Sequence, residues 1–173
     1  MNEGSRYPTE IRPAGQSDID GLLVVERQCF NVHYYAYYML GRRDFEHYLE
    51  NSSCTFLVAV LDTEIVGYVL GPVEPWRVPA AAHIDSIAVL PEAQYKTIGT
   101  HLLHSFMQQA QRQGCKLITL EVAIANDTGL AFFARHGFQP LRPLRNYYGQ
   151  GLHAQFMAAS IERPEPWDLP ADP

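Results

Sequence analysis

Two periods of hydrophobic and polar positions meet in the middle of this chain, between His83 and Gly114. The residues from Ala82 to Val89 are mostly apolar or β-branched and are followed by Pro91, which predicts a strand. The next stretch is apolar at helical spacing and ends before Gly114, a residue typical of helix C-termini. The apolar residues of this predicted helix are Ile98, Leu102, Leu103, Phe106, Met107 and Ala110. A strand, a short turn and a helix are therefore expected here.

The same two patterns predict the other elements. Strands are expected at residues 11–13, 55–60, 65–70, 116–122, 138–144 and 153–161. Helices are expected after a cap at Ser17 or Asp18, after residues 42–44, and after a cap at Asn126. Residues 71–79, which hold three prolines, should form a loop, and residues 145–151 should form a turn.

The order of these elements indicates an α/β fold. Residues 82–122 form a strand–helix–strand unit, which should be a right-handed crossover between parallel strands. The hairpins on either side should make the remaining pairs antiparallel, so we expect a mixed, mostly antiparallel sheet with helices on both faces. Residues 1–161 should form a single domain with a loose start at residues 1–10. Residues 162–173 are rich in proline and acidic side chains and should form a flexible tail.

Composition and charge exclude several classes of protein. The chain has 173 residues, 18% of them charged, and a formal net charge of −6, which suits one domain with its own core and argues against general nucleic-acid binding. No apolar stretch has the length of a membrane span, and the N-terminus does not resemble a signal peptide. The three cysteines are widely spaced and indicate neither a disulfide framework nor a zinc site. We therefore expect a cytoplasmic protein without a bound metal, and the acidic balance is compatible with an amine substrate.

The turn between the central strand and its helix is the first candidate for a binding site. Backbone N–H groups at the start of a helix point outward, where the helix dipole is positive, so such a turn can hold phosphate. The turn lacks the residues of a P-loop and the three glycines of a Rossmann fingerprint. It follows another pattern, in which Val-x-Pro leads to Gln-x-x-Gly-x-Gly. Here Val89-Leu90-Pro91 precedes the segment from Gln94 to Gly99.

This pattern resembles the acetyl-CoA pyrophosphate loop of the GCN5-related N-acetyltransferases, with Thr97 in place of the first glycine. The second half of the chain is similar to the RimI-like branch, whose members acetylate protein N-termini, including that of a ribosomal protein. The matching segments are Leu120–Val122, Asn126, Phe133–Phe138 and Arg145–Tyr148. The resemblance covers residues 11–161. It implies the acyl-CoA N-acyltransferase fold, acetyl-CoA as cosubstrate, and an amine acceptor such as a protein N-terminus.

The resemblance also implies which residues contact the cofactor. The strand residues Ile87, Ala88 and Val89 would pair with pantetheine through their backbone, and Asn126 would meet the cofactor arm, unless it is only a helix cap. The pyrophosphate would be held by the amides of Gln94, Tyr95, Lys96, Thr97, Ile98, Gly99 and Thr100. Lys96 and Arg135 would lie near the nucleotide, unless they are ordinary solvated charges. Because threonine resists a positive φ and crowds a phosphate, Thr97 predicts weakened binding of acetyl-CoA.

Acetyl transfer to an amine needs a group that removes a proton, because an amine is mostly protonated at neutral pH. Glu121 is the first candidate, because it is the charged residue inside an apolar strand and matches the glutamate proposed as base in RimI-like enzymes. It could instead be an exposed or salt-bridged glutamate. His83 is a second candidate, although a histidine there is more often packed, and Asp85 would share its face of the strand. A backbone N–H near Val89 could stabilise the oxyanion.

The proton donor for the departing thiolate is less apparent. Many members of the family carry a tyrosine in the helix after Asn126, and Phe133 takes that position here. Tyr147 and Tyr148 are possible substitutes, but the resemblance assigns this pair to substrate contact, and simple packing in a hairpin turn would also explain them. The tyrosine-rich residues 33–38 could pack a helix connection or line the substrate cleft.

Three functions remain open from the sequence. The leading one is an acetyl-CoA-dependent N-acetyltransferase that acts on a protein N-terminal α-amine by direct attack on the thioester. The second is the same chemistry on a small amine, such as a polyamine, an amino acid or an antibiotic. The third is a non-catalytic acyl-CoA-binding module, which Thr97 and Phe133 keep open. We expect a monomer or a homodimer.

Overall fold

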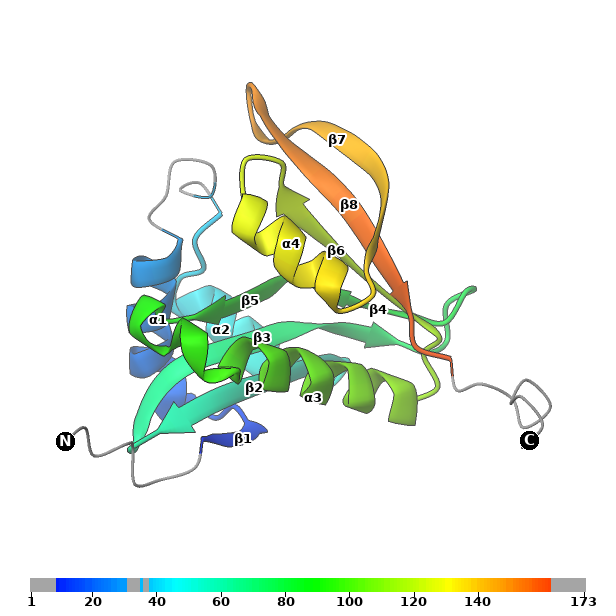
Figure 1. The fold of residues 1–173 in the computed structure, drawn as a ribbon. Helices are drawn as coiled ribbons and strands as arrows, with labels where there is room; N and C mark the ends of the chain where they lie inside the picture. Colours follow the sequence, from blue (N-terminus) through cyan, green and yellow to red (C-terminus); the bar gives the residue numbers. More distant parts are fainter. Residues whose placement is uncertain (1–8, 31–34, 36–37, 163–173) are drawn as a thin grey trace, which may run out of the picture.

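The computed structural model describes residues 9–30, 35 and 38–162, with the side chains of residues 95 and 96 left aside. The predicted loose N-terminus, most of the predicted tail and most of the tyrosine-rich segment thus lie outside the described residues. An eight-stranded sheet runs in the order β1-β2-β3-β4-β6-β8-β7, with β5 paired to β3 beside this path (Figure 1). The strands are β1 (Glu10–Pro13), β2 (Cys54–Leu61), β3 (Glu64–Glu74), β4 (Ala81–Ile84), β5 (Ser86–Val89), β6 (Leu117–Ala123), β7 (Gln139–Gly149) and β8 (Leu152–Ser160).

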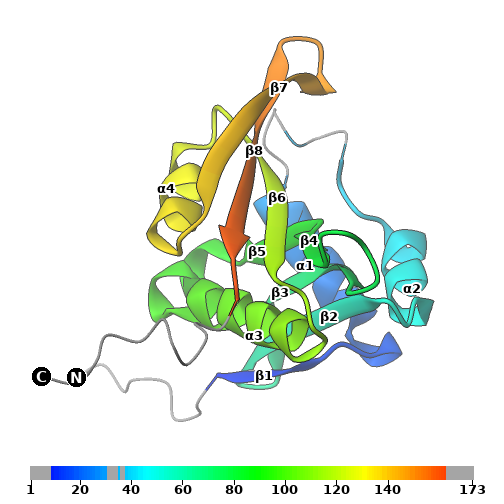
Figure 2. The ribbon, with the colours of Figure 1, turned by 90° about the vertical axis from the view of Figure 1, so that its right-hand side faces the viewer.

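Within the described ranges, four α-helices cover the two faces of this sheet. They are α1 (Ile19–Cys29), α2 (Arg42–Glu50), α3 (Ile98–Arg112) and α4 (Asp127–Arg135), with short 3₁₀ turns η1 (Gln16–Asp18) and η2 (Pro91–Lys96) before α1 and α3. Helices α1 and α2 lie on one face, and α3 and α4 lie on the other (Figure 2). Among the described residues, no helix has both the length and the apolar character needed to cross a membrane.

The connectivity confirms the predicted fold class. Strand β4 leads through α3 to β6, and β4 pairs with β6 in parallel. The other strand pairs of the described chain are antiparallel. The protein is therefore an α/β fold with a mixed, mostly antiparallel sheet.

The core forms where α3 packs on the sheet. The apolar stripe predicted for this helix is buried, with Leu102, Leu103 and Phe106 fully enclosed and Met107 half-buried at its edge. On the opposite face, Tyr68 of β3 is fully buried between α1 and α2 and contacts Phe45 of α2 edge-on. Helix α3 ends as expected, because Gly114 has a φ of 92°, which a glycine adopts without strain.

The central strand differs from the prediction of one continuous strand over residues 82–89. It is broken at Asp85 into β4 and β5. Both pair with β3, but β4 also pairs with β6 and β5 does not. Along β3, Val73 lies opposite Ala82 and Leu70 lies opposite Ser86, so the central strand has one extra residue between these points. This is a β-bulge, which bends a strand away from its neighbour. Gly71 permits it, because a Cβ there would lie 1.9 Å from the carbonyl oxygen of His83.

Three other predictions need correction. Strand β3 continues to Glu74, into the predicted loop, and β7 continues to Gly149, through most of the predicted turn at 145–151. The pairing of β7 with β8 becomes irregular there, and Asn146 adopts a φ of 55°. Asp18 stands at the start of α1, but its carboxylate does not cap the helix. It accepts hydrogen bonds from Arg12 at 2.7 and 2.8 Å and from the amide of Gly15.

Candidate active site

The break in the central strand opens a cavity of about 610 Å³. Strands β4 and β6 are paired as far as Ile84 and Leu120. Beyond this point the pairing ends, because β5 continues along β3 while β6 continues along β8, its neighbour over its whole length. The two strands therefore diverge, as Figure 1 shows. The cavity between them is lined from α1, α2, β4, β5, the start of α3, β6, α4 and β7. It contains Glu121, Tyr147 and Tyr148 together with most of the residues predicted to hold the cofactor.

One edge of β5 faces this cavity. The amide of Leu90 donates to Val66 of β3 at 2.9 Å, and backbone groups alternate between the two sides of a strand, so Ile87 and Val89 turn theirs away from β3. The carbonyl of Val89 accepts from Gln94 Nε2 at 3.0 Å and from Cys29 Sγ at 3.3 Å. Burial raises the pKa of Cys29 to about 11, so this thiol stays protonated and can donate. The backbone groups of Ile87 and the N–H of Val89 therefore face the cavity, where an extended ligand could pair with them as a further strand would.

The predicted phosphate turn is a 3₁₀ turn followed directly by the first turn of α3. Thr97 joins the two with φ 61° and ψ 6°, the left-handed conformation for which glycine would be the usual residue. The amides of Ile98, Gly99 and Thr100 belong to the first helical turn, where no intrahelical acceptor exists. A Cβ on Gly99 would meet only the Phe132 ring and Val89 at ordinary contact distance, so packing within the protein does not require glycine there. A ligand that approaches the backbone closely at this position would explain a glycine there.

The wall opposite β5 comes from α4. Asn126 caps this helix as predicted, since its Oδ1 accepts from the amide of Gly129 at 3.0 Å, and its Nδ2 donates to Tyr35 at 3.2 Å. Phe133 is buried and lines the cavity, and Arg135 is exposed in the last turn of the helix and also reaches the lining. The side chain of Thr100 lies 3.2 Å from His136, which ties the start of α3 to the end of α4. Tyr95 and Lys96 belong to η2, and the role predicted for the Lys96 side chain lies outside the described part of the structure.

Glu121 and His83 contact each other in the cavity and form an ion pair when His83 is protonated. The Nε2 atom of His83 lies 2.9 Å from Oε2 of Glu121, and Nδ1 lies 2.7 Å from the hydroxyl of Thr119. Asp85 Oδ1 is 3.7 Å from the same Nε2. Burial lowers the pKa of His83, but the hydrogen bond and charge of Glu121, with the charge of Asp85, outweigh this and leave the pKa raised. The two base candidates are therefore one coupled pair.

Tyrosines surround this pair. Tyr148 donates to the carbonyl of Glu121 at 3.2 Å and stacks edge-on with Tyr35, while Tyr38 donates to the carbonyl of Tyr147 at 2.6 Å. Burial, followed by the charge of Glu121 and a hydrogen bond to it, raises the pKa of Tyr147 to about 12. Burial also raises the pKa of Tyr148. Tyr35 and Tyr38 both line the cavity and pack against other tyrosines. These two residues of the tyrosine-rich segment therefore serve packing and form part of the cavity wall.

Comparison with known proteins decides the family. Residues 21–138 match the model of the acetyltransferase (GNAT) family. The chain belongs to the GNAT family. An N-alpha-acetyltransferase from Sulfurisphaera tokodaii is 30% identical over 169 residues, which cover 92% of this chain and 96% of that protein. The predicted family and the acetyltransferase class are thus confirmed.

Solved structures of GNAT proteins share the fold. The ribosomal-protein-S18-alanine N-acetyltransferase from Escherichia coli superposes with a TM-score of 0.76 at 18% identity, covering 92% of this chain and 97% of that one. The PaiA N-acetyltransferase from Thermoplasma acidophilum, solved in complex with coenzyme A, superposes with a TM-score of 0.73 at 20% identity and covers 89% and 99% of the two chains. At these identities the likeness concerns the fold.

Two residues of this GNAT cavity were not singled out from the sequence. Glu26 of α1 is 1% exposed, and its carboxylate accepts from the amide of Leu40 at 2.6 Å and from the hydroxyl of Tyr68. Burial raises the pKa of Glu26. Its position four residues after Leu22, on the apolar stripe of the helix, was a signal that the sequence carried. Tyr48 of α2 donates to Asp85 Oδ2 at 2.6 Å, a contact between distant segments that no local pattern indicates.

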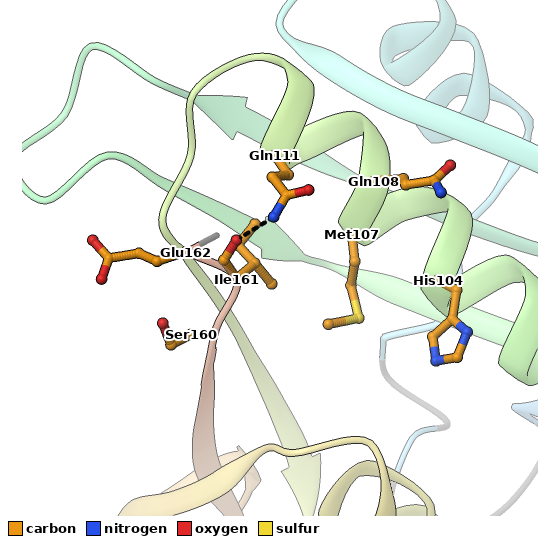
Figure 3. Close-up of a pocket in the computed structure, with 7 residues that line it drawn as sticks. All are labelled: His104, Met107, Gln108, Gln111, Ser160, Ile161 and Glu162. Carbon is orange, nitrogen blue, oxygen red and sulfur yellow. Dashed lines mark hydrogen bonds between the residues drawn. The ribbon is translucent and has the colours of Figure 1, made fainter. Parts of the chain in front are cut away.

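A second hollow of about 360 Å³ lies on the outer side of α3 (Figure 3). It is lined by His104, Met107, Gln108, Gln111, Ser160, Ile161 and Glu162. Gln111 donates to the carbonyl of Ile161 at 2.6 Å and so joins α3 to the end of β8. None of the predicted site residues lines this hollow. Within the described part of the chain there is also no group of three or more side chains placed to hold a metal ion.

Proposed function

We propose that this GNAT protein transfers the acetyl group of acetyl-CoA to the α-amine at a protein N-terminus. The observation that carries the proposal is that one cavity joins the open edge of β5 to the His83–Glu121 pair. The first feature suits a thioester arm and the second suits removal of a proton from an amine. The Sulfurisphaera relative is named an N-alpha-acetyltransferase, and the PaiA structure contains coenzyme A, which supports both halves of the proposal.

Acetyl-CoA would bind along β5 and the start of α3. Pantetheine would pair with the backbone of Ile87, in the manner of an added strand, and its thioester end would lie beside the Val89 N–H. Its pyrophosphate would sit on the amides of Thr97 to Thr100, where the helix dipole favours negative charge. Asn126 and Arg135 would contact the cofactor from α4. This arrangement leaves the thioester at the point where β5 and β6 diverge.

Glu121 would act as the general base. An acceptor amine that enters beside the tyrosines meets a carboxylate already hydrogen-bonded to His83 at 2.9 Å, and a proton given to this pair can be shared between them. Proton removal, directly or through water, gives the neutral amine that attacks the thioester carbon. Tyr147 would orient the carboxylate through its hydrogen bond to the Glu121 side chain, and Tyr148 holds the backbone of Glu121 through its carbonyl.

The tetrahedral intermediate would be stabilised from β5. The Val89 N–H faces the cavity and can donate to the oxyanion as the carbonyl becomes tetrahedral. The nitrogen then gives its second proton to solvent, the carbon–sulfur bond breaks, and coenzyme A leaves as a thiolate. Phe133 offers no proton at this step. A thiol has an ordinary pKa of about 8.5, so a thiolate can depart near neutral pH and take its proton from water.

The test is thiol release from acetyl-CoA with a panel of acceptors. The panel should contain peptides with a free N-terminus, the same peptides with an acetylated N-terminus, and small amines. We expect release with free peptides and none above background with blocked ones. Release with small amines alone would refute the N-terminal assignment and support the small-amine alternative. Binding of acetyl-CoA without release for any acceptor would instead support a non-catalytic module.

A further inference from the structure

A carboxylate next to the proposed base has no place in the chemistry described so far. Asp85 lies at the bulge between β4 and β5, and its side chain is 31% exposed and lines the cavity. Its Oδ2 accepts from the hydroxyl of Tyr48 at 2.6 Å, and its Oδ1 lies 3.7 Å from His83 Nε2. The Tyr48 bond fixes the direction of the carboxylate. Because Glu121 approaches the same histidine nitrogen at 2.9 Å, Asp85 stands beside the point where the amine would lose its proton.

Negative side chains outnumber positive ones around His83 in this cavity. Asp85 and Glu121 carry two negative charges, and His83 supplies one positive charge when protonated and none when neutral. Among the described residues that line the cavity, Arg135 is the only lysine or arginine, and it belongs to α4, on the cofactor side. Asp85 and Glu121 share the one histidine between them, and burial raises the pKa of Asp85 despite the Tyr48 bond and the charge of His83, which agrees with incomplete compensation of the carboxylate. A positive group on the acceptor would complete the compensation.

The walls beside Asp85 suit a long basic side chain. Tyr38 and Tyr147 stack with nearly parallel rings, and Tyr48 stands over Asp85 from α2. Aromatic surfaces bind the apolar stem of lysine or arginine while the charged end reaches a carboxylate. Asp85 and Glu121 both lie within 3.7 Å of His83 Nε2, so the side chain of one residue can reach Asp85 while its α-amine lies at Glu121.

We propose that Asp85 is a specificity-determining residue that selects acceptors with a second positive charge beside the reacting amine, namely peptides whose first residue is lysine or arginine. This inference rests on the proposed function and adds a substrate class to it. A hydrogen-bonded ion pair in a half-buried cavity should favour such an acceptor about tenfold or more over an uncharged one of the same shape.

The experiment compares peptides that are identical except for a first residue of lysine or norleucine, which share a stem and differ in the charge. For each we would measure kcat/KM, and also the Kd for the protein loaded with coenzyme A. The variant is Asp85→Asn, and Glu50→Gln is the matched control, because Glu50 is an exposed carboxylate of α2 outside the cavity. The ratio of the two peptides decides the question, since any change in His83 caused by Asp85→Asn affects both peptides alike.

We expect the wild-type protein and Glu50→Gln to prefer the lysine peptide about tenfold or more, and Asp85→Asn to lose the preference. Equal kcat/KM and Kd for the two peptides in the wild-type protein would overturn the proposal, as would a preference that survives in Asp85→Asn. A third arm compares 1,4-diaminobutane with butylamine, and a charge preference confined to this pair would overturn the peptide assignment. If no acceptor is acetylated, the proposed function fails, and the ratio of the two Kd values still decides the role of Asp85.

Discussion

Replacing Glu121 with glutamine separates a catalytic role of this residue from a structural one. The amide keeps the shape of the side chain and can still accept a hydrogen bond from His83, 2.9 Å away, but it cannot take a proton. A positioned general base contributes about 10²- to 10⁴-fold to a rate, which corresponds to about 3–5 kcal/mol of activation free energy. We therefore expect Glu121→Gln to lower kcat/KM at least 100-fold.

The loss of folding stability in the same variant should be much smaller. A hydrogen bond to a charged group is worth about 1.5–3 kcal/mol and a neutral one about 0.5–1.5 kcal/mol, so the exchange costs about 1 kcal/mol. Partial exposure of the pair, 14% for Glu121 and 27% for His83, lowers this further. Against a typical free energy of unfolding of 5–15 kcal/mol, the variant remains folded. A 100-fold loss of activity would therefore not arise from unfolding.

The assay is thiol release from acetyl-CoA with one accepted peptide, combined with calorimetric binding of acetyl-CoA and thermal unfolding. The Kd of acetyl-CoA should stay within about twofold of the wild-type value, because Glu121 is not on the β5 edge. Glu50→Gln, which removes one exposed carboxylate from α2, should match the wild-type protein in all three measurements. Turnover of Glu121→Gln within about threefold of wild type would refute the assignment of Glu121 as the base.

Three further changes test other parts of the site. Thr97 adopts a left-handed conformation, which costs a threonine about 1–2 kcal/mol of folding free energy, and Thr97→Gly removes this cost but gives the unfolded chain more freedom. Calorimetry should therefore show a net stabilisation of about 0.5–1 kcal/mol and tighter binding of acetyl-CoA. An unchanged Kd would show that Thr97 does not weaken cofactor binding. Because the pKa of His83 is raised, its ion pair with Glu121 stabilises the fold below about pH 6.5 and ceases to do so as pH rises through the raised value. The difference in free energy of unfolding between wild type and His83→Gln, measured with denaturant, should therefore shrink from about pH 5.5 to 8.5. A difference that grows over this range would contradict the argument. Phe133→Tyr places a hydroxyl in the cavity and should raise kcat severalfold, whereas an unchanged kcat would show that departure of the thiolate needs no acid.

The elements around the cavity were predictable because their signals are local. The apolar spacing of α3, Pro91 before it and Gly114 after it all lie within one stretch of sequence, and the cap at Asn126 depends on a residue three positions away. Glu121 was identifiable because a charged residue interrupts an apolar strand. These features fixed the fold class and located one wall of the site.

The contacts between the candidate catalytic residues depend on register between distant strands. His83 meets Glu121 because β4 and β6 pair in parallel with His83 opposite Thr119, and no pattern within either strand reveals that alignment. The bulge at Asp85 arises from one extra residue relative to β3. Similarly, β7 extends through the predicted turn because Asn146 bonds to His153 and Gly151 and keeps the two strands together.

Product mapping by mass spectrometry tests the central claim most directly. The substrate is a peptide with a free N-terminus and one internal lysine, incubated with acetyl-CoA and the wild-type protein, so that an α-amine and an ε-amine compete in one molecule. We predict acetylation of the α-amine alone, and its loss in Glu121→Gln. Acetylation of the internal lysine, or of added small amines in preference to the peptide, would contradict N-terminal acetyl transfer as the function of this cavity.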